Sequence, residues 1–135
     1  MSDSETLTPT SPFEQIGGEA GVRRLAEVFY DIMDANPDFH ALRAMHEPDL
    51  APMRTALAGF LTAWLGGPRD WIEQRGGFCI MSRHAGMGIT AITSRQWLAA
   101  MRQAIARTGT PPALAVKLDQ ALTRLGEAMV QDRRG

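Results

Sequence analysis

The amino-acid sequence predicts a single all-α domain, on three observations. Apolar residues recur at three- and four-residue spacing in the stretches 19–34, 50–64, 93–108 and 111–129, which is the period of amphipathic helices. No stretch of useful length alternates apolar and polar residues as a strand would. Neither an internal repeat nor a low-complexity linker divides the 135 residues, a length that fits one compact core. About five substantial helices are expected from these periods.

The first helix is expected to begin at Ser11 and to be very short. Ser11 is a suitable N-cap, Pro12 suits the first helical position, and Glu14 is placed to complete a capping box. The pair Gly17-Gly18 ends this helix after about one turn, because paired glycines favour a bend.

The next helix, over residues 19–34, has one apolar stripe that predicts a buried face. The stripe consists of Val22, Leu25, Ala26, Phe29, Ile32 and Met33. Tyr30 shares a side with part of this stripe, so its ring is expected to point inward. Its hydroxyl then needs a hydrogen-bond partner, since a buried phenol without one is costly.

A connection and a third helix follow. Asn36-Pro37 closes the preceding helix, and a short helical or irregular segment then contains His40 and His46. Asp49 is a candidate cap for the third helix, in which Pro52 falls in the first turn and does no harm. The wide apolar face of this helix contains Leu50, Met53, Leu57, Phe60, Leu61 and Trp64.

The second half of the chain predicts a connection and two more helices. Residues 69–77 read as a partly helical connection. Thr93 is expected to cap the following helix, with Gln96 completing a capping box. The pair Thr110-Pro111 opens the last helix, which keeps a helical period to Met129.

Composition excludes several classes of function. The hydrophobic fraction of 44% and the charged fraction of 21% are those of an ordinary soluble globule. A formal net charge of −1 provides no basic surface for nucleic acid or an anionic membrane. No apolar run approaches the roughly 20 residues of a bilayer span. The single Cys79 excludes an internal disulfide and agrees with a reducing cytoplasm.

The two ends of the chain are expected to lie outside the domain. Residues 1–10 are acidic and rich in hydroxyl groups, with no apolar segment of the kind a signal peptide needs, and predict a disordered tail. Residues 132–135 predict a solvated C-terminal tail. The domain is therefore expected over residues 11–131, in a cytoplasmic protein.

The usual catalytic motifs are missing from the sequence. It contains no phosphate-binding glycine loop, no HExxH, no CxxC and no GxSxG. His40 and His46 are six positions apart, which does not place them on one helical face as a zinc pair. Acidic residues are scattered over predicted polar faces, so no pair of carboxylates stands out.

One histidine has an unusual setting. His84 ends a short apolar segment, follows the cationic Arg83, and precedes Gly86. In a helical protein such an imidazole can hold a haem iron, while apolar walls and a few hydrogen-bond donors act on the other side. A histidine that packs in a core or caps a helix end explains the same spacing. Periodicity by itself does not identify haem.

A resemblance favours the haem hypothesis. Going along the chain, the sequence contains Phe13-Glu14-Gln15-Ile16-Gly17-Gly18, Phe29-Tyr30-Asp31, Trp64-Leu65-Gly66-Gly67-Pro68, Arg83-His84 and Trp97-Leu98. Each piece is weak, but the ordered set resembles the truncated haemoglobins, and specifically their second group. The resemblance covers nearly the whole ordered chain. It implies a truncated globin fold, a 2-over-2 helical sandwich around a haem pocket, with haem b (iron protoporphyrin IX) as cofactor.

The resemblance also implies roles for individual residues. His84 matches the proximal histidine that ligates iron, and Arg83 matches a position that commonly pairs with a haem propionate. Tyr30 matches the distal tyrosine that donates to bound dioxygen. Trp97 matches the buried tryptophan whose indole N–H faces the ligand. His46 falls where the family places tyrosine, phenylalanine or histidine near the ligand. A core tyrosine and a packing tryptophan are the alternatives for Tyr30 and Trp97.

The same resemblance places the walls of the pocket and shows one departure. Met53 and Leu57 match the distal-helix positions closest to iron, and Phe60 would pack against the macrocycle. After His84 the family usually carries proline and phenylalanine, whereas this chain has the run Ala85-Gly86-Met87-Gly88. That run adds backbone entropy and places the thioether of Met87 close to the haem edge.

Three functions remain open on the sequence. The first is a haem protein that binds dioxygen and related diatomic gases reversibly, with oxygen transport as one use. The second is a haem enzyme that oxidises nitric oxide or reduces peroxide, which needs an external electron-donating reductase because no flavin or nicotinamide motif is present. The third is a haem-free helical interaction or sensor module. Both a monomer and a homodimer agree with the sequence.

Overall fold

The computed structural model describes residues 11–74 and 89–130, and these are helical with short connections. The four long helices are α3 (Gly18–Ala35), α5 (Ala51–Trp64), α8 (Ala91–Arg107) and α9 (Pro112–Ala128). The short ones are α2 (Pro12–Gln15), the 3-10 turn η1 (Pro37–Phe39), α4 (His40–Arg43) and α6 (Asp70–Glu73). Within the described residues there is no strand, and the predicted all-α class is confirmed.

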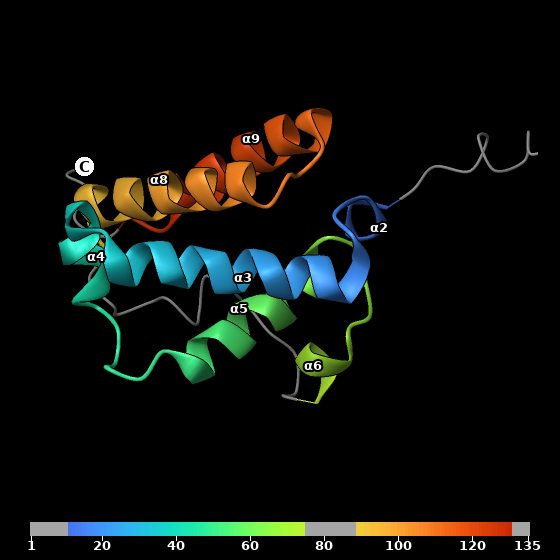
Figure 1. Cartoon of the computed structure of the whole chain (residues 1–135), viewed down its shortest axis with the longest axis horizontal. Helices are drawn as coiled ribbons and strands as arrows, with labels where there is room; N and C mark the ends of the chain where they lie inside the picture. Colours follow the sequence, from blue (N-terminus) through green and yellow to red (C-terminus); the bar gives the residue numbers. More distant parts are fainter. Residues whose placement is uncertain (1–10, 75–88, 131–135) are drawn as a thin grey trace, which may run out of the picture.

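The long helices form two packed pairs. Helix α3 packs against α5 on one side and against α8 on the other, and α8 also packs against α9. Figure 1 shows α8 and α9, in orange and red, on one side of α3, with α5 and α6, in green, on the opposite side. The pair α3 and α5 therefore faces the pair α8 and α9. The predicted 2-over-2 arrangement is confirmed.

The N-terminal helix α2 begins as the sequence predicts. The backbone N–H of Glu14 donates to Ser11 Oγ at 3.1 Å, and the N–H of Ser11 donates to Glu14 Oε1 at 3.2 Å. Gly17 then takes a left-handed conformation at φ +109°, which turns the chain into α3. The N–H of Phe13 donates to the carbonyl of Leu65 at 2.9 Å, so α2 is fastened to the end of α5.

Helix α3 crosses the middle of the core. Every residue of the predicted stripe is buried, and so is Tyr30. Asn36 ends the helix, and its side chain accepts from the N–H of Asp38 at 2.9 Å to begin η1. The short η1 and α4 confirm the predicted connection, in which His40 is exposed. Further core residues come from α5, α8 and α9, among them Leu61, Leu98, Ala100, Met101, Ala104, Ile105, Leu114, Leu118 and Leu122.

The start of α8 differs from the prediction. Thr90, not Thr93, is the N-cap, and the helix begins at Ala91. The capping box is made by two threonines: the N–H of Thr93 donates to Thr90 Oγ1 at 3.1 Å, and the N–H of Thr90 donates to Thr93 Oγ1 at 3.0 Å. A hydroxyl at the third helical position thus replaces the expected carboxylate or amide. Gln96 does not take part in this capping box and instead accepts from the N–H of Leu42.

The start of α5 differs from the prediction by one residue. Leu50 is the N-cap residue, while Asp49 Oδ1 accepts from the N–H of Ala51 at 3.0 Å. Pro52 lies in the first turn. After Trp64 the chain turns at Gly66, where φ is +96°. Among the described helices, none has the length and apolar content that crossing a membrane requires.

Candidate functional site

An aromatic cluster lies where α3, α8 and the segment after α4 meet. The Phe29 ring centroid is 4.8 Å from that of Tyr30 and 5.4 Å from that of Trp97. The Tyr30 ring centroid is 5.9 Å from that of His46, with an edge-to-face angle of 76°. The structure thus brings together the three residues predicted on the ligand side, Tyr30, Trp97 and His46. Phe29, which is fully buried, joins them.

The Tyr30 hydroxyl has an unusual position. Only 3% of the residue is exposed, yet its hydroxyl makes no hydrogen bond in the part of the chain that the structure describes. Burial raises the pKa of Tyr30 to about 12, although the positive charge of Arg54 acts to lower it. The phenol therefore stays protonated at neutral pH and keeps its proton for donation. The alternative of a core tyrosine would need an internal acceptor for the hydroxyl, and none is found among the described residues.

His46 is held by the turn that follows α4. Its Nδ1 lies 2.9 Å from the carbonyl oxygen of Leu42. A carbonyl only accepts, so Nδ1 carries the proton and donates. In the neutral ring, Nε2 is then an acceptor. His46 can offer a second N–H only as the imidazolium.

The turn that carries His46 is also connected to α8. The backbone N–H of Leu42 donates to Gln96 Oε1 at 2.9 Å. Gln96 directly precedes Trp97, so two neighbouring residues on α8 contact Phe29 and the turn that holds His46. The sequence predicts a capping role for Gln96, and sequence reasoning missed its hydrogen bond with Leu42.

The inner face of α5 supplies an apolar wall. Met53, Leu57 and Phe60 are partly buried and pack against the core, as does Trp97. Phe60 stacks on Trp64 with ring centroids 6.0 Å apart, and Trp64 is 37% exposed. Apolar side chains that are neither fully buried nor open to solvent fit the wall of a pocket for a flat apolar group. The residues present therefore fit a haem on this side.

The predicted proximal residues belong to a part of the chain that the structure does not describe. His84, Arg83 and Met87 are outside the described residues, and so is Cys79. Among the described residues, no group of three or more histidine, cysteine, aspartate or glutamate side chains could hold a metal ion. A set of carboxylate or thiolate ligands is thus not an alternative within those residues.

A surface cavity of about 400 Å³ lies away from the aromatic cluster. It is formed where the end of α3 meets α8, and its lining is Asp31, Ile32, Ala35, Asn36, Pro37, Gln103 and Arg107. None of the residues predicted for ligand or cofactor lines it. We place the candidate site at the aromatic cluster, because the buried Tyr30 and the half-buried Trp97 and His46 converge there.

Two helix pairs packed around a cluster of aromatic rings define a small all-helical protein. Comparison with known proteins makes the class specific. The family model described as bacterial-like globin matches residues 11–131. The group 2 truncated hemoglobin YjbI of Bacillus subtilis is 30% identical over 99 residues, which cover 73% of this chain and 72% of that protein.

Solved structures give the same result. A cold-adapted truncated hemoglobin from the Antarctic marine bacterium Pseudoalteromonas haloplanktis superposes with a TM-score of 0.88 at 31% identity, covering 92% of this chain and 100% of that one. The group II 2-on-2 hemoglobin from Agrobacterium tumefaciens superposes with a TM-score of 0.87 at 31% identity, covering 91% and 95%. The chain belongs to the bacterial-like globins, and its relatives are group II truncated haemoglobins. Membership implies a haem cofactor and binding of diatomic ligands.

Proposed function

We propose that this chain binds haem b through His84 and retains a diatomic ligand, with dioxygen as the reference case, by hydrogen bonds from Tyr30 and Trp97. The observation that carries the proposal is the Tyr30 side chain. It is buried at 3% exposure, and its hydroxyl is without a hydrogen bond among the described residues. Among the described residues nothing engages the phenol O–H, which is therefore available to donate to a bound ligand.

When bound, the haem iron supplies an open coordination position for dioxygen, nitric oxide or carbon monoxide. Tyr30 donates its O–H to the ligand, and its high pKa keeps that proton in place. Trp97 donates its indole N–H, which is always protonated. A hydrogen bond to a charged acceptor contributes about 1.5–3 kcal/mol, so two such donors slow the escape of a ligand that carries negative charge.

His46 has a different part in this proposal. With Nδ1 donating to Leu42, the neutral ring has no second N–H for a ligand. Its edge-to-face contact with Tyr30 supports a role in holding the phenol ring. We therefore assign donation to Tyr30 and Trp97, and assign His46 the support of Tyr30.

The remaining residues would hold the cofactor. Met53, Leu57 and Phe60 would pack on the porphyrin from α5, which their partial burial supports. Arg83 would pair with a propionate, and Met87 would lie at the haem edge, as the family resemblance implies. Exclusion of water from this interior would strengthen the hydrogen bonds inside it.

Visible spectra of the purified protein test the proposal. The ferric, ferrous and carbonmonoxy forms should each show a Soret band. His84→Ala should lose stable haem binding, while His40→Ala, which alters an exposed histidine in the connection after α3, should keep it. A wild-type protein that stays colourless after hemin is added would refute the proposal and favour a haem-free interaction module.

A second measurement separates ligand binding from turnover. Slow ligand release suits redox chemistry on bound oxygen, nitric oxide or peroxide better than bulk transport. Consumption of nitric oxide or peroxide, with a supplied electron donor in place of the reductase, would assign the enzyme function. Reversible oxygenation without such consumption would assign binding.

A further inference from the structure

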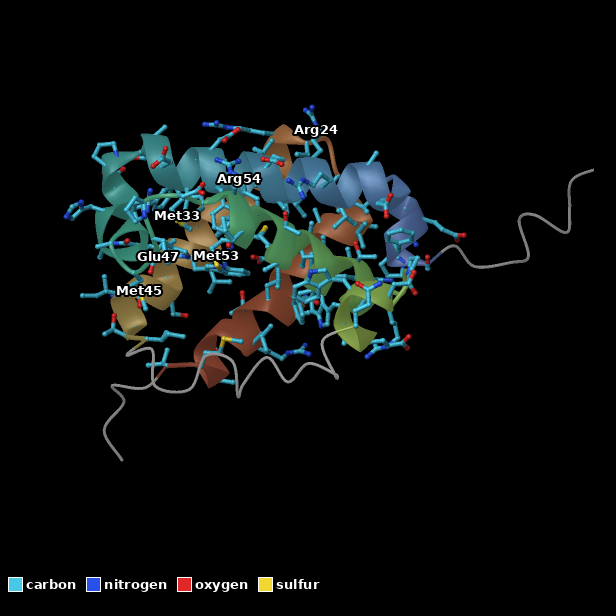
Figure 2. All side chains as sticks on the ribbon, turned by 90° about the horizontal axis from the view of Figure 1, so that it is seen from below. Arg24, Met33, Met45, Glu47, Met53 and Arg54 are labelled. Atoms are coloured by element: carbon cyan, nitrogen blue, oxygen red, sulfur yellow. The ribbon has the colours of Figure 1, made fainter. Side chains whose placement is uncertain are left out.

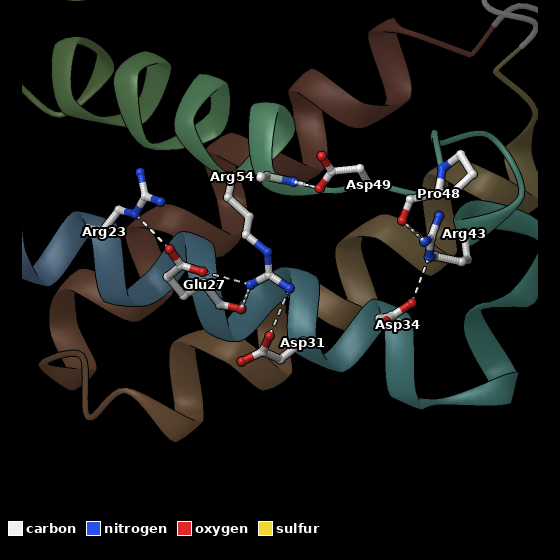
Figure 3. A network of polar contacts seen from close by, with 9 residues as sticks. Arg23, Glu27, Asp31, Asp34, Arg43, Pro48, Asp49 and Arg54 are labelled. Atoms are coloured by element: carbon white, nitrogen blue, oxygen red, sulfur yellow. Dashed lines mark hydrogen bonds and ion pairs between the residues drawn. The ribbon is translucent and has the colours of Figure 1, made fainter.

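One arginine connects the helix that carries Tyr30 with the helix that forms the apolar wall. The Arg54 guanidinium, on α5, reaches over α3 (Figure 2). Its Nη1 donates to Glu27 Oε1 at 2.7 Å and to the Glu27 carbonyl at 3.0 Å. Its Nη2 lies 2.9 Å from Asp31 Oδ1. Figure 3 shows these contacts and a further ion pair, in which Arg23 Nε contacts the second Glu27 carboxylate oxygen at 2.7 Å.

These contacts are more specific than ordinary surface ion pairs. Only 20% of the Arg54 side chain is exposed. Burial opposes the charge of Glu27, but hydrogen bonds from Arg54 and Arg23 and their charges outweigh it, so the pKa of Glu27 is lowered. Three contacts in different directions need the planar guanidinium, which presents its donors in a rigid fork. A lysine has the charge but not the fork.

The same guanidinium lies against the distal tyrosine. Arg54 Cζ is 5.9 Å from the centroid of the Tyr30 ring, within the range of a cation–π contact. Glu27 and Asp31 are one helical turn apart on α3, and Tyr30 lies between them in the sequence. The neighbour of Arg54 on α5 is Met53, one of the proposed wall residues. Arg54 therefore contacts the Tyr30 ring and also the acidic residues that precede and follow Tyr30 on α3.

We propose that Arg54 is a positioning residue for Tyr30, and that the rate at which a diatomic ligand leaves depends on the Arg54 contacts with Glu27 and Asp31. This inference rests on the proposed function. Arg54 does not contact the ligand in this account. It holds α3 and α5 at a fixed spacing and holds the phenol ring in place. The direction of the Tyr30 hydroxyl depends on both.

A double-mutant cycle gives the kinetic test. Arg54→Lys keeps the positive charge and removes the planar guanidinium. It should speed oxygen dissociation by about three- to tenfold, which is within the range of coupling measured between residues in contact. In a Tyr30→Phe background the same substitution should change the rate less than about twofold, because the hydroxyl it positions is absent. An equal effect in both backgrounds, or no effect in either, would overturn the inference.

A matched control and a milder variant accompany this cycle. Arg102 also connects two helices, because it pairs with Asp119 across α8 and α9. Arg102→Lys should leave oxygen dissociation unchanged in both backgrounds. Asp31→Asn removes one partner of Arg54 at a side chain that is 66% exposed, so folding should not suffer. It should shift the rate in the same direction as Arg54→Lys, and by less.

A spectroscopic readout is independent of ligand kinetics. Tyr30 is the only tyrosine in the chain, so protein labelled with 3-fluorotyrosine gives one ¹⁹F resonance. Arg54→Lys should move or broaden that resonance in the protein as purified and in its ferrous carbonmonoxy form, while Arg102→Lys should not. An unchanged resonance in Arg54→Lys overturns the positioning role whatever the haem content. A missing Soret band instead overturns the proposed function, and the fluorine signal still decides the role of Arg54.

Discussion

Replacing Tyr30 by phenylalanine should separate ligand retention from stability. The ring contacts to Phe29 and His46 survive the substitution, because only the hydroxyl is removed. That hydroxyl has no hydrogen bond within the described residues. The free energy of unfolding of the haem-loaded protein should therefore change by no more than about 0.5 kcal/mol.

The rate of oxygen release should change much more. A hydrogen bond from a neutral donor to a charged acceptor contributes about 1.5–3 kcal/mol, and about 1.4 kcal/mol corresponds to a factor of ten. Tyr30→Phe should therefore speed oxygen dissociation by about 10- to 100-fold. Stopped-flow replacement of oxygen by carbon monoxide measures this rate, and urea unfolding followed by circular dichroism measures the stability.

Ser94→Ala is the matched control for removal of a hydroxyl. Ser94 is buried on α8, and its Oγ donates to the carbonyl of Gly126 at 3.0 Å. This variant should lose about 1 kcal/mol of stability and leave oxygen dissociation unchanged. If Tyr30→Phe changed the dissociation rate less than about twofold, or if it destabilised the protein as Ser94→Ala does, the distal role of Tyr30 would be wrong.

Three further outcomes follow from the structure. Burial raises the pKa of Tyr30 to about 12 from 10.0 for the free side chain, so its contribution to stability is complete below pH 10 and is lost as pH rises through 12. The free energies of unfolding from urea titrations at pH 10 and pH 12 should differ by about 2 kcal/mol more in wild type than in Tyr30→Phe. Gly59→Ala should destabilise the protein by about 1–3 kcal/mol in thermal unfolding, despite the better helix propensity of alanine, because the new Cβ would lie 2.4 Å from Cδ2 of Trp71; unchanged stability would contradict this packing. Gln96→Ala should cost about 1 kcal/mol and speed amide exchange at Leu42, whose N–H donates to Gln96, and unaltered exchange there would show that this hydrogen bond is not stable in solution.

Local periodicity was sufficient to predict the helices. The apolar stripe of α3 repeats at helical spacing, so its buried face, including Tyr30, follows from the order of residues. The box at Ser11 and Glu14 is equally local. The sequence predicts Thr93 as the N-cap of α8, whereas Thr90 is the N-cap, because a threonine hydroxyl serves both as a cap and as the third-position partner of a cap.

The candidate site depended on contacts that periodicity does not contain. Phe29 and Trp97 are far apart in the sequence, and the structure packs their rings together. Only the family resemblance predicts that Tyr30 and Trp97 lie on one side of a ligand. Arg54 and Glu27 look like ordinary solvent-facing charges in a helical pattern. Their ion pair depends on how α3 and α5 pack, which the residues of either helix do not specify on their own.

The central claim is that this chain encloses one haem beside the cluster of Phe29, Tyr30 and Trp97. Titration of the purified protein with hemin, followed through the Soret band and the quenching of tryptophan fluorescence, tests it most directly. We expect both signals to reach their end point together at one haem per chain, and His84→Ala to show no such end point. A titration of wild type that never saturates, or an equal end point in His84→Ala, would contradict the account.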